Sequence, residues 1–172
     1  DVGIRNQIRK VTKEKNMNFE IESYVKPLPS EILLDNNEKF WKVSLPLDFR
    51  QFMMKYNGCI PKNRQLKINN HEYFIERFLC ILDDPQENDF GMYDIDVVWS
   101  QLDERLFFHD DILGVELLPI AILFAGDFIC LDFSQDRLSP SICIWYHEES
   151  YELEPSIQKV ADSFSEFLEM LY

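Results

Sequence analysis

Cysteine and histidine are the residue types in this sequence with the most direct catalytic potential. Cys143 and His147 fall on the same face of one expected strand, an arrangement that suggests a nucleophile and its base. Four residues of strand separate the two side chains by about 13 Å, which is far beyond hydrogen-bond reach. An intact strand over these residues therefore excludes a Cys–His dyad.

Metal binding is the second chemistry that the residue types permit. Two runs join a histidine to acidic residues, His109-Asp110-Asp111 and His147-Glu148-Glu149. A solvated acidic turn with an incidental histidine is the simpler explanation of each. The acidic segment 83–96 lacks the alternating ligands, the central glycine and the closing glutamate of a calcium-binding EF-hand loop. Weak calcium affinity of that segment stays open, but we expect no dedicated metal site and no cofactor.

Sequence motifs of the large enzyme classes are also absent. The chain contains no GxSxG, HExxH, P-loop or GxGxxG pattern, and its five glycines leave little for a phosphate-binding loop. We therefore expect a protein that is not an enzyme. A catalytic site assembled from scattered residues stays open as an alternative.

The net charge narrows the choice of partner. Seventeen lysines and arginines stand against 31 aspartates and glutamates, which gives a formal net charge of −14. Such a field repels nucleic acid and anionic membranes and attracts basic proteins. We therefore expect a protein partner with a basic surface, and neither nucleic acid nor a membrane. Plain solubility of an acidic domain explains the charge equally well.

Three segments combine acidic and aromatic residues and are the expected contact surfaces for such a partner: 83–96, 103–111 and 147–154. Aromatic side chains dominate interface energetics, while acidic rims chiefly raise association rates. For each segment taken alone, an ordinary solvated loop is the simpler explanation. The expected contact residues are Asp83, Asp84, Glu87, Asp89, Phe90, Tyr93, Asp94, Phe107, Phe108, Asp110, Asp111, Glu148, Glu149 and Tyr151.

Apolar spacing predicts the helices that would hold these segments in place. Ile4, Ile8 and Val11 mark a short basic helix over about 3–15, and 18–29 is expected to be extended. Further helices are expected from the cap Ser30 to about 42, over 47–56 with a stop at Asn57-Gly58, and over about 95–106. A last helix is expected to begin at the cap Ser156, and its apolar stripe is Val160, Phe164, Phe167, Leu168 and Leu171.

Strand signals occupy the middle of the chain. Segments 65–69 and 71–75 flank a hairpin turn at Asn69-Asn70, and 78–82 continues as an apolar strand. Segments 119–124 and 128–133 predict a central hairpin buried on both faces, and 141–147 is the next strand. We therefore expect a single α+β domain with a largely antiparallel central sheet flanked by N- and C-terminal helices. Residues 1–29 form a basic helix and extended arm, and 30–172 form the domain.

The cysteines and the apolar runs indicate a compartment. Cys80, Cys130 and Cys143 lie inside apolar runs, where a free cysteine behaves as a small buried hydrophobe. We expect reduced thiols and a reducing compartment. No signal-peptide pattern is visible, and the longest apolar stretch is about half the length of a membrane helix. The expected location is therefore cytoplasmic.

Four blocks, taken in order, resemble the SUKH superfamily, the Smi/Knr cell-wall regulator homology group. They are LPLDFRQFMMKYNGC at 45–59, LLPIAILFAGDFICLDF at 117–133, PSICIWYHE at 140–148 and VADSFSEFLEMLY at 160–172. The resemblance covers about 30–172, whereas 1–29 and the acidic loop at 83–93 fall outside it. It implies a single α+β domain.

The resemblance also implies a function, which composition alone does not supply. Most bacterial members of this superfamily are immunity proteins that bind and neutralise a polymorphic toxin, often a nuclease, by occluding it. Fungal members act instead as adaptors in cell-wall signalling and are usually much longer. A bacterial immunity protein is therefore the first expectation and a non-enzymatic adaptor the second, with the oligomeric state left open.

Overall fold

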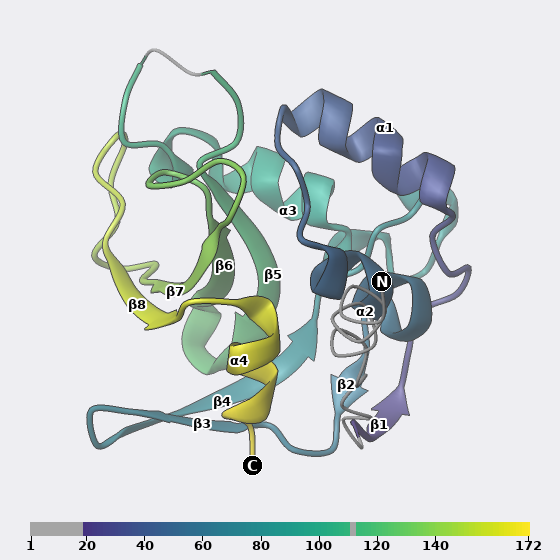
Figure 1. The fold of residues 1–172 in the computed structure, drawn as a ribbon, viewed down its shortest axis with the longest axis horizontal. Helices are drawn as coiled ribbons and strands as arrows, with labels where there is room; N and C mark the ends of the chain where they lie inside the picture. Colours follow the sequence, from purple (N-terminus) through teal and green to yellow (C-terminus); the bar gives the residue numbers. More distant parts are fainter. Residues whose placement is uncertain (1–18, 111–112) are drawn as a thin grey trace, which may run out of the picture.

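The fold is built around an antiparallel sheet in which neighbouring strands are also consecutive in sequence. The computed structural model describes residues 19–110 and 113–172 (Figure 1). The main sheet has the order β3-β4-β5-β6-β7-β8, and β1 pairs with β2 in a second small sheet. The strands are β1 (Ile21–Ser23), β2 (Ile60–Pro61), β3 (Gln65–Ile68), β4 (His71–Phe78), β5 (Leu117–Leu123), β6 (Phe128–Asp132), β7 (Ser141–Trp145) and β8 (Ile157–Ala161).

Short helices pack against this sheet. In Figure 1, α4 lies in front of the strands and α1 is the outermost helix at the upper right. The α-helices of the described residues are α1 (Glu31–Trp41), α2 (Leu47–Tyr56), α3 (Ile95–Leu102) and α4 (Phe164–Glu169), and the 3₁₀ turns are η2 (Pro85–Glu87), η3 (Gly91–Tyr93), η4 (Asp103–Leu106) and η5 (Phe124–Gly126). The predicted α+β class is confirmed. The predicted helix at 3–15 lies outside the described residues.

Local chemistry explains where several elements begin and turn. The Ser30 hydroxyl accepts a hydrogen bond from the Leu33 N–H at 3.1 Å and so caps α1, as the sequence predicts. Asn69 and Asn70 both have positive φ, which is the geometry of a tight two-residue hairpin. The predicted central hairpin forms between β5 and β6, the two central strands of the sheet, and it is buried on both faces.

The C-terminal helix is much shorter than predicted. Its cap is Ser163, whose hydroxyl accepts from the Glu166 N–H, and the predicted cap at Ser156 is wrong. Val160 belongs to β8, which pairs along β7. Without β8, the outer edge of β7 would leave its backbone N–H and C=O groups without partners. Strand pairing therefore decides the conformation of Val160, and its helical spacing from Phe164 is coincidental.

Two other predicted boundaries also shift. The helix predicted over 95–106 is α-helical only to Leu102, because Asp103 takes a φ of 37° and the chain tightens into η4. The strand predicted over 78–82 is not a ladder strand. β4 already ends at Phe78, and Cys80 makes a single parallel bridge to Asp94.

Alternating side chains of the inner strands fill two separate cores. Ile129, Leu131 and Ile144 join the large core beneath the helices, together with the packed rings of Phe49, Phe52, Phe78, Phe164 and Phe167. On the other face a small core contains Leu106, Leu117, Cys130, Cys143 and Trp145. The residue Leu106 of η4 therefore covers the second face of the sheet.

Residues 19–29 pack on the domain. Phe19 contacts the rings of Phe52, Tyr56 and Phe78 at centroid distances between 5.2 and 6.5 Å, and Val25 is buried. We therefore propose that the boundary between arm and domain lies at or before residue 19, and not at 29 as the sequence predicts.

Asn57 links three parts of the chain from the end of α2. Its Nδ2 donates to the carbonyl oxygens of Pro27 and Ile81, at 3.2 and 3.1 Å, and its Oδ1 accepts from the Ile81 N–H at 2.8 Å. Its own carbonyl accepts from the Val25 N–H at 2.7 Å. The left-handed residue that ends this helix is Gly58, where a Cβ would lie 2.7 Å from the Val25 side chain.

Replacing Asn57 by alanine should destabilise the fold by about 3 kcal/mol, because it leaves one buried N–H and two carbonyl groups without their partner. Urea unfolding followed by circular dichroism measures the change. Asn36→Ala, on the exposed face of α1, is the matched control and should not destabilise the fold. A loss below about 1 kcal/mol for Asn57→Ala would show that water replaces the side chain.

The thiols should be inert in the folded protein. Burial raises the pKa of Cys59 and of Cys80 to about 12, and the hydrogen bond with Cys130, together with burial, raises the pKa of Cys143. Since the thiolate is the reactive form, Ellman's reagent at pH 8 should modify all four cysteines in urea and none within minutes in buffer. Rapid modification of the native protein would contradict this placement of the thiols.

Candidate partner-binding surface

Two of the three predicted acid–aromatic segments meet and border one open hollow of about 610 Å³. The backbone joins them directly, because the Leu153 N–H donates to the Glu104 carbonyl at 2.9 Å. The hollow is lined by Leu102, Asp103, Glu104, Arg105, His147, Glu148, Ser150, Tyr151 and Glu152. We call these residues the acidic hollow.

Arg105 holds the two sides of the acidic hollow together. Its guanidinium donates to the carbonyl oxygens of His147 and Ser150, the latter at 3.0 Å. The same group lies 5.1 Å from the centre of the Trp145 ring, whose Nε1 donates to the Arg105 carbonyl at 3.0 Å. Because these hydrogen bonds go to backbone carbonyls, Arg105 fixes the geometry without forming an ion pair with the surrounding carboxylates.

The loop that supplies the second side is internally ordered. The buried hydroxyl of Ser150 accepts from the Ser156 N–H at 2.9 Å, and the backbones of Tyr151 and Glu154 form an isolated antiparallel bridge. The side chain of Tyr151 is left 65% exposed. An aromatic ring on an ordered backbone loses little entropy on binding, so Tyr151 is suited to anchor a partner.

Two carboxyl groups of the acidic hollow affect each other. The interaction with Glu152 raises the pKa of Glu104, and repulsion from Asp103 and Asp110 acts in the same direction. Like charges so close are unfavourable in the free protein. A cationic group from a partner would relieve that repulsion, which favours a basic ligand for this surface.

The third predicted segment, 83–96, does not line the acidic hollow. Arg77 organises it, with its guanidinium 4.2 Å from the ring centre of Tyr93 and 5.5 Å from that of Phe90. The same guanidinium donates to the Gly58 carbonyl at 2.8 Å. Phe90 remains partly exposed, and the acids exposed beside it are Asp83, Asp84, Glu87 and Asp89.

Two of the expected contact residues are structural. Asp94 is 3% exposed, and its carboxylate accepts from the backbone N–H groups of Leu82, Asp96 and Val97, so it caps α3. Burial raises the pKa of Asp94, an effect that these hydrogen bonds partly offset. Phe107 is also 3% exposed and packs edge-on against Trp99. Neither side chain is available to a partner, so both leave the expected contact set.

Of the remaining expected contact residues, some make hydrogen bonds within the protein and others are simply exposed. The Phe108 N–H donates to the Glu116 carboxylate at 2.6 Å, and the ring of Phe108 is half-buried. Glu149 is exposed and accepts from the Ser156 hydroxyl at 3.0 Å. Asp110 and Glu148 are exposed, while Asp111 lies outside the described residues.

The cysteine and histidine side chains with catalytic or metal-binding potential do not come together in the described residues. β7 ends at Trp145, so His147 lies beyond the strand, whereas the Cys143 thiol is buried against Cys130 across the β6–β7 ladder. His109 lies 3.1 Å from Glu116. Within residues 19–110 and 113–172, no group of three or more His, Cys, Asp and Glu side chains is placed to hold a metal ion.

Sequence reasoning missed the residue that assembles this surface. Arg105 is the one arginine or lysine among the acids of 103–111, and that isolation is the only signal that marks it. Its partners are backbone carbonyls on a loop more than 40 residues away, and no side-chain pattern encodes such contacts.

No helix in the described part of the chain is both long enough and apolar enough to cross a membrane.

Comparison with known proteins places the chain in a family. A SUKH family model, described as SMI1-KNR4 cell-wall, matches residues 31–168. The chain is also similar to the SPbeta prophage-derived uncharacterized protein YokK of Bacillus subtilis (strain 168), at 26% identity over 131 residues. That match covers 72% of this chain but only 65% of the relative's length. Because the family model spans most of the chain, this protein belongs to the SUKH (SMI1-KNR4) family.

Proposed function

We propose that this protein is an immunity protein that binds a cognate polymorphic bacterial toxin, of nuclease type, and neutralises it by occlusion in the cytoplasm of the producing cell. The observation that carries the proposal is the acidic hollow, where two segments distant in sequence present carboxylates around the exposed ring of Tyr151. Family membership supports the same function, because the family includes immunity proteins.

The charge distribution suits a nuclease as the partner. A nuclease active site must bind a polyanion, so its surface is basic. The carboxylates of Asp103, Glu104, Glu148 and Glu152 would attract that surface over a Debye length and compete with the nucleic acid for it. Tyr151 would then contact the partner directly and slow dissociation.

Occlusion requires tight binding but no catalysis by this chain. Nanomolar affinity corresponds to about −12 kcal/mol, which an interface of roughly 1,600 Å² can supply. The acidic hollow alone is too small for such an area. The exposed acids around Phe90 are a second acidic surface with an aromatic ring, and we propose that the toxin contacts it as well.

A non-enzymatic adaptor of the cell-wall regulator branch is the second proposal. The description of the matching family model favours it, since that description names the cell wall. The acidic hollow would serve an adaptor equally well as a docking surface. A protection assay separates the two functions: if a polymorphic toxin domain is encoded beside this gene, cells that express that domain should survive only when this protein is co-expressed. Death in both cases would favour the adaptor.

Reversing two charges of the acidic hollow should slow association with that toxin domain. Glu148→Lys combined with Glu152→Lys should lower the association rate about tenfold at low ionic strength and much less at high salt. Glu76→Lys with Asp162→Lys makes the same charge change at exposed positions outside the three acid–aromatic segments and is the control. Stopped-flow fluorescence over a range of salt concentrations measures both. Equal rates for the two double variants would exclude the acidic hollow as the steering surface.

Truncating the exposed ring should act on dissociation instead. Tyr151→Ala should weaken binding by about 2 kcal/mol, chiefly through faster dissociation, because the ring is the large aromatic group on the rim. Stability should change by less than about 0.5 kcal/mol, since the ring is mostly exposed. Surface plasmon resonance and urea unfolding measure the two effects. An unchanged dissociation rate would place the contact elsewhere.

A further inference from the structure

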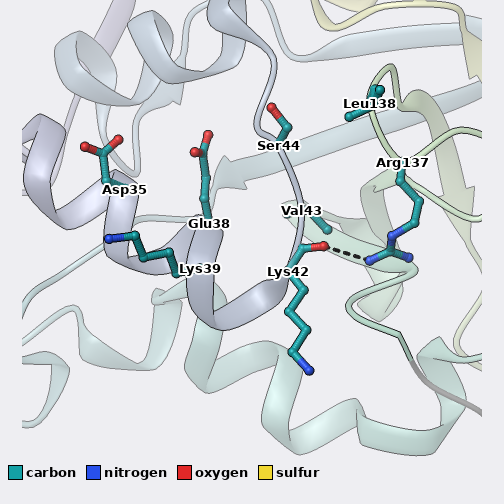
Figure 2. A pocket seen from close by; sticks show the side chains of 8 residues that line it. All are labelled: Asp35, Glu38, Lys39, Lys42, Val43, Ser44, Arg137 and Leu138. Atoms are coloured by element: carbon teal, nitrogen blue, oxygen red, sulfur yellow. Dashed lines mark hydrogen bonds between the residues drawn. The ribbon is translucent and has the colours of Figure 1, made fainter.

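A second hollow, of about 640 Å³, lies at the C-terminal end of α1 and has the opposite charge balance (Figure 2). Its two acids, Asp35 and Glu38, are both paired with Arg50, at 2.9 and 3.0 Å. The hollow is lined by Asp35, Glu38, Lys39, Lys42, Val43, Ser44, Arg137 and Leu138, and we call these residues the basic hollow.

The cations of the basic hollow lack acidic partners. Among the described residues, no ion pair involves Lys39, Lys42 or Arg137. Asp136 is next to Arg137 in sequence, but its carboxylate accepts from the backbone N–H groups of Leu138 and Ser139. In a chain with a net charge of −14, three unpaired cations around one concavity are a local reversal of sign.

The surrounding backbone fixes the position of the Arg137 side chain. It donates to the Lys42 carbonyl at 2.9 Å, a contact drawn in Figure 2. Gly114 leaves the room for it, because a Cβ at that position would lie 2.2 Å from its guanidinium nitrogen. Lys42 ends α1 with a φ of 55°, a left-handed position where glycine or asparagine is usual. The chain thus carries a lysine where its backbone favours a smaller residue.

The arrangement in Figure 2 indicates the shape of the ligand. Arg137 reaches the end of α1 from its own loop, the Lys42 side chain extends away from that contact, and Lys39 lies farther along the helix near Asp35. The three cations do not converge on one point, so a single small anion would meet only one of them. Leu138 follows Arg137 in the same loop and is 81% exposed.

We propose that the basic hollow binds an extended acidic peptide segment of a partner protein. Its carboxylates would lie against Lys39, Lys42 and Arg137, and an apolar side chain would pack on Leu138. Nucleic acid fits less well, because its phosphates form a continuous line of charge, whereas the three cations do not converge and a phosphate backbone offers no apolar group to pack on Leu138. The site is independent of the acidic hollow and of the toxin proposed for it.

A fluorescein-labelled peptide of alternating glutamate and leucine is the probe, and fluorescence anisotropy is the measurement. Lys39→Gln with Lys42→Asn should weaken binding at least tenfold, and asparagine at residue 42 preserves the left-handed backbone. Lys55→Gln with Lys67→Gln removes the same charge outside the hollow and should change affinity less than twofold. Lys39→Gln alone leaves residue 42 untouched and should give an intermediate loss.

The apolar contact has its own test. Leu138→Ser should weaken binding of the glutamate–leucine peptide. A glutamate–serine peptide, which should bind the unaltered protein more weakly, should bind the variant with the same affinity as it binds the unaltered protein. Three results would each overturn the proposal: no binding of the glutamate–leucine peptide by the unaltered protein, equal losses in the two lysine double variants, or tighter binding of oligodeoxythymidylate of the same charge.

Discussion

The central hairpin is apolar on both faces, and both faces must be buried by other segments of the chain. Much of the rest of the structure depends on this requirement. The helices bury one face in the large core. The other face of the hairpin carries Leu117 and Cys130, and Cys143 and Trp145 of β7 continue it, so all four would be exposed unless another segment packed on them. Leu106 of η4 covers that face, and this packing brings Asp103 and Glu104 of the same turn to the loop that follows β7. The acidic hollow is therefore a consequence of how the second face of the sheet is buried.

Buried polar side chains connect the segments that the sheet does not. Asn57 joins the end of α2 to the chain near Pro27 and Ile81, and Asp94 joins the start of α3 to Leu82. Several hydrogen bonds to backbone groups offset the cost of burying these two side chains, and the same bonds fix the loops that they reach. The acidic segment 83–93 lies between these two anchors, so it is held at both ends while its carboxylates remain in solvent.

Charge on this protein is organised locally as well as in total. The net value of −14 describes the long-range field, whereas partners meet individual surfaces. In the acidic hollow, Arg105 gives its hydrogen bonds to carbonyl oxygens and leaves the carboxylates unpaired. In the basic hollow, Arg50 pairs both acids and leaves the lysines unpaired. One arginine in each place thus decides the sign of the surface that a partner meets.

The sequence by itself determined the α+β class, the central hairpin, the helices that begin at Ser30 and near Leu47, and the family, because capping residues, turn residues and apolar periodicity act over a few residues. Tertiary structure decided that Val160 is in a strand and that Asp94 and Phe107 face inward, since strand pairing and burial depend on residues far away in the chain. It also decided that two of the three acid–aromatic segments form one surface. Their junction rests on hydrogen bonds from Arg105 to backbone carbonyls, which every residue possesses and which no sequence pattern marks.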